Sequence, residues 1–363
     1  MIRILHYVPA FGYGGIESFV MNLYNNIDRS KIQFDFLVEA DMPDNVRQEI
    51  LNLGGNVYKI PKMTASLNIF KYLKALKGVF SERKWVAFHC HSLQTRPFPM
   101  LYAKAYGIKI RILHIHSNKF NNGNKGCFKN FVQRLLLNFG ARLANTYVAC
   151  SKSSANSMLP SMYKDKAYVL NNAIELDKYK FSEEDRKVNR SGVGEKTVVL
   201  GIIGRLSYLK NQKYILELLK RITIDYNIWI IGDGEDRTYL EENYNTSNIK
   251  YFGNINNVNE VINAIDLLLV PSISEGLPLT ILEAQANGLP CIVSEAIEDE
   301  FIFNDNISKI DLSDADHWVD SINSFNLSKG RSNINEKIMD YDVSKTSDEY
   351  EIIIDREMKK WIS

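Results

Sequence analysis

Short apolar runs recur along the whole chain and alternate with stretches of helical periodicity. In the first half they cover residues 2–8, 34–38, 56–60, 86–91, 110–116, 146–150 and 167–170. Continuous apolar runs separated by helices are typical of parallel strands that are covered on both faces of their sheet. The first half therefore predicts a doubly wound α/β domain.

The same pattern starts again after a polar, charged segment at 182–196. Apolar runs follow at 197–204, 227–234, 249–254, 266–272 and 290–294. The fold class is thus α/β, with two doubly wound Rossmann-like domains. We place them at 1–172 and 173–340, and we expect a C-terminal helix at 341–363 to pack back toward the first domain. Ligands of such sheets bind outside the carboxyl ends of the strands, so the cleft between the domains is the expected site.

Composition narrows the class of protein. The 363 residues are 45% hydrophobic and 24% charged, and no stretch approaches the ~20 apolar residues of a spanning helix. The first apolar run ends in a Gly-rich loop without a cleavage pattern, so we expect a cytoplasmic protein. The four cysteines form no C-x-x-C, and we assign them neither a disulfide nor a structural zinc.

Charge is distributed unevenly. Residues 1–180 hold 25 Lys+Arg and 11 Asp+Glu, whereas the remainder holds 19 and 32. Two basic segments, 70–80 and 128–144, have amphipathic patterns. They are either ordinary surface helices packed on the sheet or a face that binds an anionic membrane. We expect no nucleic-acid partner, because no such binding motif accompanies the basic residues.

The densest candidate site lies at 272–290. An apolar strand leads into a turn with Glu275 and Gly276, and Pro278 stands where a helix can begin. The free backbone amides of a helix N-terminus suit a phosphate. Glu275 and Glu283 are too far apart in the sequence to act as the carboxyl pair of a glycosidase. They could instead hold opposite ends of an extended ligand.

Two more strand ends in the second half carry polar residues. Gly204-Arg205 closes the first strand of this half, and Lys210 follows five residues later. A guanidinium and an ammonium at this place would neutralise a diphosphate leaving group. The segment Gly232-Asp233-Gly234-Glu235 is either a simple tight turn or a part of the same site.

Together these motifs resemble the retaining glycosyltransferases of family 4, which have the two-domain GT-B fold. Within that family the chain is similar to bacterial capsular and exopolysaccharide enzymes. The resemblance extends over essentially the whole chain. The matching pieces are Gly14-Gly15-Ile16-Glu17, 114–118, 171–179, 204–211, 230–235, 270–294 and Glu300.

The resemblance implies roles for residues of the second domain. Arg205 and Lys210 would stabilise the departing diphosphate beside Gly204, and Glu275 would contact hydroxyls of the donor sugar. Three further residues would bind the nucleotide sugar, namely Glu283 at the ribose and the amides of Gly276 and Leu277 at the β-phosphate.

In the first domain the resemblance implies a loop and a histidine. The loop around Gly14 and Gly15 would close over the phosphates, with glycines that permit a close backbone approach. Two histidines are candidates for a place beside the reacting sugar, and we favour His116 over His114 because it is nearer the carboxyl end of its strand. His89 and His91 are expected to be structural, and a role near the acceptor is the alternative.

The sequence departs from the family pattern at the crossing between domains. Asn172 stands where many members have glycine, and we expect it to adopt the left-handed conformation instead. A later donor-side acid could be Glu295, Glu298 or Glu300.

The implied activity is retaining transfer of a sugar from a nucleotide-diphosphate sugar, with uridine as the expected base. The implied acceptor is a glycan or an undecaprenyl-diphosphate-linked saccharide of a bacterial surface polysaccharide. We expect no metal and no cofactor beyond the nucleotide-sugar co-substrate, and a cytoplasmic enzyme with a peripheral place on the inner membrane face. Two alternatives remain open, a nucleotide-sugar 2-epimerase and a non-catalytic subunit that binds nucleotide sugar.

Overall fold

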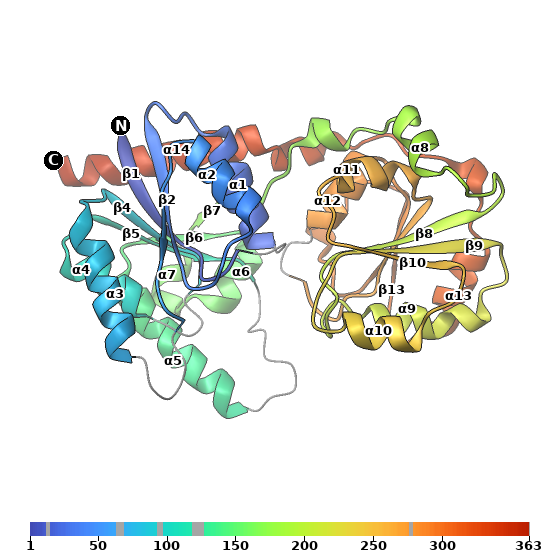
Figure 1. Cartoon of the computed structure of the whole chain (residues 1–363), viewed down its shortest axis with the longest axis horizontal. Coiled ribbons are helices and arrows are strands. Elements are labelled where there is room, and N and C mark those ends of the chain that lie inside the picture. The colour runs from blue at the N-terminus through green and yellow to red at the C-terminus, as the bar shows by residue number, and fades with distance from the viewer. Residues whose placement is uncertain (12–14, 63–68, 93–96, 118–126, 276–278, 363) are drawn as a thin grey trace. The chain divides into compact units, whose positions relative to one another are not determined.

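The chain forms two compact units, each built around its own sheet (Figure 1). The computed structural model describes residues 1–11, 15–62, 69–92, 97–117, 127–275 and 279–362. Unit 1 comprises Met1–Ala173 together with Val343–Ser363, and unit 2 comprises Ile174–Asp342. The chain therefore returns to unit 1 for its last helix.

Unit 1 contains a seven-stranded parallel sheet of order β3-β2-β1-β4-β5-β6-β7. Its strands are β1 (Ile2–Tyr7), β2 (Ile32–Val38), β3 (Val57–Lys59), β4 (Ala87–Cys90), β5 (Ile110–Ile115), β6 (Thr146–Ala149) and β7 (Tyr168–Val169). Residues in β2 and β4 are buried along their whole length, as expected for strands covered on both faces. The predicted doubly wound α/β class is confirmed.

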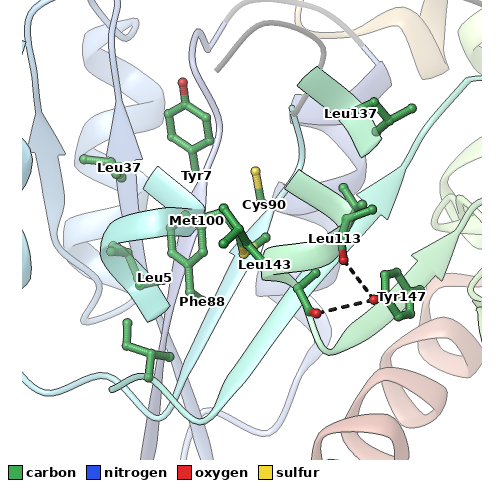
Figure 2. Packing of buried hydrophobic residues seen from close by; sticks show 14 of the residues in the cluster. Leu5, Tyr7, Leu37, Phe88, Cys90, Met100, Leu113, Leu137, Leu143 and Tyr147 are labelled. Atoms are coloured by element: carbon green, nitrogen blue, oxygen red, sulfur yellow. Dashed lines mark hydrogen bonds between the residues drawn. The ribbon is translucent and has the colours of Figure 1, made fainter. Parts of the chain in front are cut away.

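Helices cover both faces of this sheet. One face carries α1 (Gly15–Asn26), α2 (Asp44–Asn52) and α14 (Val343–Ile362). The other carries α3 (Ile69–Glu82), α4 (Phe98–Ala105), α5 (Cys127–Leu143), α6 (Lys152–Met158) and α7 (Ser161–Lys164). Figure 2 shows the core under this second face, where strand residues such as Phe88 and Leu113 lie with Met100 and Leu137 from the helices.

The C-terminal helix α14 is an integral part of unit 1. Tyr350, Ile353 and Ile354 are buried in the same core as the residues of α1 and β2. The ring of Tyr350 meets that of Phe34 edge-on, with centroids 5.8 Å apart. Near the end of the helix, Glu357 accepts a hydrogen bond of 2.8 Å from the Tyr168 hydroxyl. The first sheet is thus completed by residues far away in the sequence.

Unit 2 contains a six-stranded parallel sheet of order β10-β9-β8-β11-β12-β13. Its strands are β8 (Val198–Ile203), β9 (Tyr226–Ile231), β10 (Ile249–Gly253), β11 (Leu267–Val270), β12 (Cys291–Ser294) and β13 (Ile307–Ile310). The sequence pattern did not reveal β13, because Ser308 and Lys309 make half of this short strand polar.

Helices also lie on both faces of the second sheet. The cores place α8 (Glu183–Asn189), α11 (Val258–Val261) and α12 (Leu279–Ala286) on one face, and α9 (Gln212–Leu218), α10 (Arg237–Asn243) and α13 (Ala315–Asn323) on the other (Figure 1). Short 3-10 segments connect these elements, among them η1 (Leu176–Tyr179), η3 (Ile262–Ala264), η4 (Asp299–Phe301) and η6 (Glu336–Tyr341). Among the residues described, none of the helices is both long and apolar enough to span a bilayer.

The burial of Tyr350 predicts that α14 stabilises unit 1. Tyr350→Ala should lower the local stability of unit 1 by about 3–5 kcal/mol, because it leaves a cavity where a large ring was packed. Native-state hydrogen exchange of β1 and β2 amides measures this loss. Ile352→Ala is the matched control on the same helix, since Ile352 is 61% exposed. Equal exchange rates in the two variants would contradict the role of α14.

Candidate active site

Two loops meet at the carboxyl ends of β8 and β11, which are neighbours in the second sheet. The loop after β8 holds residues 204–211, and the loop after β11 begins at Pro271. The Ile273 amide donates a hydrogen bond of 2.8 Å to the Leu209 carbonyl. The Asn211 side chain donates to the Pro271 carbonyl at 3.1 Å. These bonds fix the two loops against each other.

An ion pair joins the two loops at this point. The ammonium of Lys210 lies 2.5 Å from Oε1 of Glu275. The Ser272 hydroxyl donates to the same oxygen at 2.6 Å. The side chains of Lys210 and Glu275 are only 26% and 9% exposed, so water screens this pair less than a surface pair. Two of the predicted site residues are therefore brought together.

A small pocket is built around this pair. Its lining includes Ile203, Lys210, Ser272, Glu275 and Thr280. It lies where the two strands end, which is the usual place for a ligand in a parallel sheet.

The backbone of Gly204 borders the ammonium of Lys210. Gly204 has φ 138°, and a Cβ atom at this residue would lie 3.9 Å from Lys210 Nζ. Only glycine adopts such a conformation readily. The backbone of Gly204 therefore lies next to the Lys210–Glu275 ion pair.

The glycines of the 232–235 turn have a packing role. A Cβ atom on Gly232 would lie 2.1 Å from the Gly204 carbonyl oxygen, and one on Gly234 would lie 2.1 Å from that of Leu206. The backbones of the two loops are in direct contact, and Leu206 N donates to the Asp233 carbonyl at 2.9 Å. The turn thus supports the loop that carries Arg205 and Lys210.

Arg205 has a different neighbour from Lys210. Its Nε lies 3.1 Å from Oε2 of Glu235, and the two side chains are 64% and 57% exposed. Solvent weakens such a pair. Within the described part of the chain, no hydrogen bond or ion pair joins Arg205 to Lys210 or Glu275. The structure therefore brings Lys210 to Glu275, whereas Arg205 pairs with Glu235 at the surface.

Glu283 lies on α12 and is held by a tyrosine. The Tyr179 hydroxyl donates a hydrogen bond of 2.9 Å to Glu283 Oε1. The Asn287 side chain donates to the Tyr179 carbonyl at 2.9 Å and so anchors Tyr179. Burial raises the pKa of Glu283 to about 7, against the opposing effects of the Tyr179 bond and the charge of Lys210. Near neutral pH this carboxyl group is divided between its charged and neutral forms.

Several predicted residues lie outside the described residues. These are Gly14 in the first loop and Gly276, Leu277 and Pro278 before α12. Of the candidate later acids, Glu295 pairs with Lys309 at 3.5 Å, and Glu300 lies within η4.

The remaining candidates belong to unit 1. Gly15 is the first residue of α1, and no atom of the described residues would lie within 4 Å of a Cβ at this residue. His116 directly follows β5 and is partly buried, whereas His114 is 2% exposed. Nε2 of His116 lies 2.8 Å from Nδ1 of His91. Burial lowers the pKa of His116 to about 3, with a small opposing effect of Asn172.

The expected left-handed conformation of Asn172 is wrong. Among the described residues, Asn211 is the one non-glycine residue with positive φ, at 56°. Asn172 is buried, and the chain continues beyond it into a parallel bridge between Ile174 and Asp342. An extended segment of this kind needs no left-handed residue.

Two residues that hold the site are not among those expected from the sequence motifs. Ser272 bonds Glu275, and Tyr179 bonds Glu283. Tyr179 is separated from Glu283 by 104 positions, so no local pattern indicates their contact. Ser272 lies within the motif of Glu275, and its spacing of three residues across a turn was the available signal.

Two units, each with a parallel sheet and helices on both of its faces, define the fold, which is GT-B. The crystal structure of Anabaena Alr3699/HepE in complex with UDP and glucose has this architecture, with a TM-score of 0.77 and 16% identity over 98% of this chain and 100% of that one.

Both units match family models. Residues 13–178 match the model described as Glycosyltransferase Family 4, and residues 182–337 match the model described as Glycosyl transferases group 1. The chain belongs to the family 4 glycosyltransferases.

Similar proteins in bacteria carry related names. EpsF of Bacillus subtilis, a glycosyltransferase by provisional name, is 29% identical over 82% of this chain and 80% of its own. The UDP-Gal:alpha-D-GlcNAc-diphosphoundecaprenol alpha-1,3-galactosyltransferase of Escherichia coli is 27% identical over 72% of this chain and 73% of its own.

The raised pKa of Glu283 predicts a pH-dependent effect on stability. The native state holds the Glu283 proton up to about pH 7, whereas the unfolded chain loses it near 4.5, so native stability falls as the pH rises through this window. Glu283→Gln should remove this loss and raise the melting temperature by about 7–14 °C at pH 8, with little gain at pH 5.

Thermal melts of wild type and variant at both pH values test this. Glu217→Gln is the control, since the Glu217 side chain is 54% exposed on α9. A gain of equal size at pH 5 and pH 8 would contradict the electrostatic cause.

Proposed function

We propose that this chain is a retaining glycosyltransferase of bacterial surface-polysaccharide synthesis. It would move a sugar from a UDP-linked donor to a lipid-linked glycan acceptor. The observation that carries the proposal is the Lys210–Glu275 pair, with Ser272, in the pocket at the carboxyl ends of β8 and β11. The roles proposed for the other residues depend on the position of this pair.

Lys210 is suited to the diphosphate of the donor. Its ammonium is partly buried at a strand end, where charge–charge interactions are stronger than in bulk water. A positive group aimed at the leaving oxygen stabilises charge that develops as the bond to the sugar breaks. Arg205 would supply a second positive group by turning from Glu235 toward the phosphates, and the amides of Gly276 and Leu277 would bind the β-phosphate.

Glu275 and Glu283 are suited to hydroxyl groups. A carboxylate has two oxygens and about four lone-pair directions, so Glu275 can bind Lys210 and Ser272 and still accept from a sugar hydroxyl. Glu283 is oriented by Tyr179 and would accept from the ribose hydroxyls. The two acids would thereby bind the donor at its sugar and at its nucleoside.

The reaction that fits these groups proceeds on one face of the sugar. The bond from the anomeric carbon to the diphosphate oxygen breaks, and a bond from the same carbon to the acceptor oxygen forms. The acceptor proton passes to the departing phosphate oxygen, so no carboxylate nucleophile is required. His116, with Gly14 and Gly15, would contribute from unit 1 beside the sugar and the phosphates.

Two features support a lipid-linked acceptor. The name of the Escherichia coli relative gives it a UDP-linked donor and a diphosphoundecaprenol-linked acceptor. Unit 1 of this chain also contains the basic stretch 51–164, with 18 Lys+Arg and the single acid Glu82. A basic surface attracts the anionic lipids of the leaflet in which such an acceptor lies.

Helix α5 carries the apolar part of this surface. Phe131, Leu135 and Phe139 are spaced four residues apart and are 60%, 52% and 48% exposed. Residues at this spacing form one line along a helix. On α3 of the same face, Phe70 is 84% exposed next to the exposed Lys71. Apolar side chains beside basic ones are the pattern of a helix that lies in a membrane interface.

Removal of either positive group should impair catalysis. Arg205→Ala and Lys210→Ala should each lower kcat about 100-fold to 1,000-fold, with a smaller effect on donor affinity, because their charge matters most in the transition state. A thermal-shift panel of nucleotide sugars first identifies the donor. Transfer to a diphosphoundecaprenol-linked saccharide is then followed with labelled donor.

Arg221→Ala is the control for these variants, since Arg221 forms an exposed ion pair with Asp316 in the same unit. Unchanged turnover with weakened donor binding would contradict the assigned role. Donor conversion in the absence of any acceptor would instead indicate an epimerase.

The positive side chains predict that transfer needs no metal ion. Activity should be the same within twofold in EDTA and in Mg²⁺, because Lys210 and Arg205 provide the charge that a metal supplies in other transferases. Initial rates at saturating donor measure this. Loss of turnover in EDTA that Mg²⁺ or Mn²⁺ restores would refute it.

The exposed apolar residues Phe131, Leu135 and Phe139 on α5 predict salt-dependent membrane binding. Replacement of Phe131, Leu135 and Phe139 by serine should reduce co-sedimentation with phosphatidylglycerol-containing vesicles at least tenfold, since buried apolar area and charge attraction act together. The control replaces the exposed Tyr239 and Ile273 of unit 2 by serine. Binding that is indifferent to salt and to anionic lipid would contradict the membrane role.

A further inference from the structure

Five of the six histidines of the chain lie together in unit 1. His6 is in β1, His89 is in β4 and His91 follows it, and His114 is in β5 with His116 directly after. These three strands are neighbours in the sheet. Side chains alternate along a strand, so His89 and His91 share a face, as do His114 and His116. All five rings are on the face covered by α1 and α14, where Phe19 and Tyr350 contact them.

The imidazole rings contact one another directly. His6 Nδ1 lies 3.0 Å from His91 Nε2, and His91 Nδ1 lies 2.8 Å from His116 Nε2. In a second pair, His89 Nε2 lies 3.1 Å from His114 Nδ1. A neutral ring has a lone pair to offer, which is the form that binds metals.

These contacts do not satisfy all the hydrogen-bonding groups of the five imidazole rings. A neutral imidazole has one N–H and one lone pair, and each buried nitrogen needs a partner. The described residues offer no hydrogen-bond partner to the buried Nε2 of His114. An unsatisfied buried polar group of this kind is destabilising. The cluster therefore holds more nitrogen ligands than its hydrogen bonds use.

We propose that His91, His114 and His116 form a binding site for a transition-metal dication of the zinc class. One nitrogen from each ring lies within 4.8 Å of the others. Ligands on a tetrahedral zinc are about 3.4 Å apart, given bonds of 2.0–2.1 Å, so only small side-chain shifts are needed. Two residues of a His-x-His strand and one from its neighbour supply three imidazoles, and a fourth position stays open for water.

A second set, His6, His89 and His91, has similar spacing. It shares His91 with the first set, so one ion at a time can use that ring. Its members are at most 3% exposed, whereas His116 is partly exposed, and this partial exposure favours entry of an ion at the first set. The first set is therefore the site.

Metal binding would have a consequence for activity. It would occupy the nitrogen of His116 and withdraw this ring from the donor sugar. Added Zn²⁺ should then inhibit transfer while EDTA leaves it unchanged. This consequence rests on the proposed function, whereas metal binding itself does not.

Zn²⁺ titration of the metal-free full-length protein tests the site directly. Calorimetry with a competing chelator should show one equivalent of Zn²⁺ bound, and Co²⁺ should give the intense visible absorption of a tetrahedral site. His114→Gln should weaken Zn²⁺ binding at least tenfold. His6→Gln tests the second set and should weaken Zn²⁺ binding less than His114→Gln, because His6 bonds His91 but supplies no ligand to the first set. His317→Gln is the control and should retain the wild-type affinity, because His317 lies on α13 of unit 2 and is 58% exposed.

Three outcomes would overturn the proposal. These are the absence of stoichiometric binding in wild type, equal affinity of wild type and His114→Gln, and a loss confined to His6→Gln. If His114→Gln does not fold, X-ray absorption of the zinc-loaded wild type decides by the presence or absence of three imidazole nitrogens. UDP-sugar binding to the same samples reports separately on the donor site, so failure of one claim does not imply failure of the other.

Discussion

The parallel arrangement of the strands is the constraint on which the rest of this structure depends. Every strand pairing that the structure describes is parallel. The carboxyl ends of neighbouring strands therefore meet at one edge of each sheet, and the loops that follow them are forced together. In unit 2 this edge collects Lys210, Ser272 and Glu275, and in unit 1 it collects the histidines at the ends of β4 and β5.

Backbone contact between loops turns this proximity into a defined geometry. Gly232 and Gly234 let the turn after β9 touch the backbone of the loop after β8, at distances that any side chain would prevent. Asn211, in its left-handed conformation, bonds the loop after β11. Lys210 therefore reaches Glu275 because three loops are packed on one another. A polar site of this kind is preorganised by neutral backbone groups rather than by its own charges.

The apolar pattern predicts both sheets, because strands buried on both faces of a parallel sheet consist of uninterrupted apolar residues. It missed β13, in which Ser308 and Lys309 interrupt the pattern. The motif residues Lys210 and Glu275 were predicted and lie together, since strand ends converge. The support of Glu283 by Tyr179, the pairing of Arg205 with Glu235 and the gathering of five histidines depend on contacts between distant segments. Such contacts leave no local signal, and the expected conformation of Asn172 failed for the same reason.

The central claim is that a nucleotide-diphosphate sugar binds at the edge of the second sheet where Lys210 and Glu275 meet. Hydrogen exchange of the full-length protein with and without its UDP-sugar tests this most directly, because it maps the bound surface along the whole chain. The account predicts slower exchange in residues 204–211 and 279–286, with β10 and α13 unchanged. Protection that leaves both of these segments unaffected would contradict it.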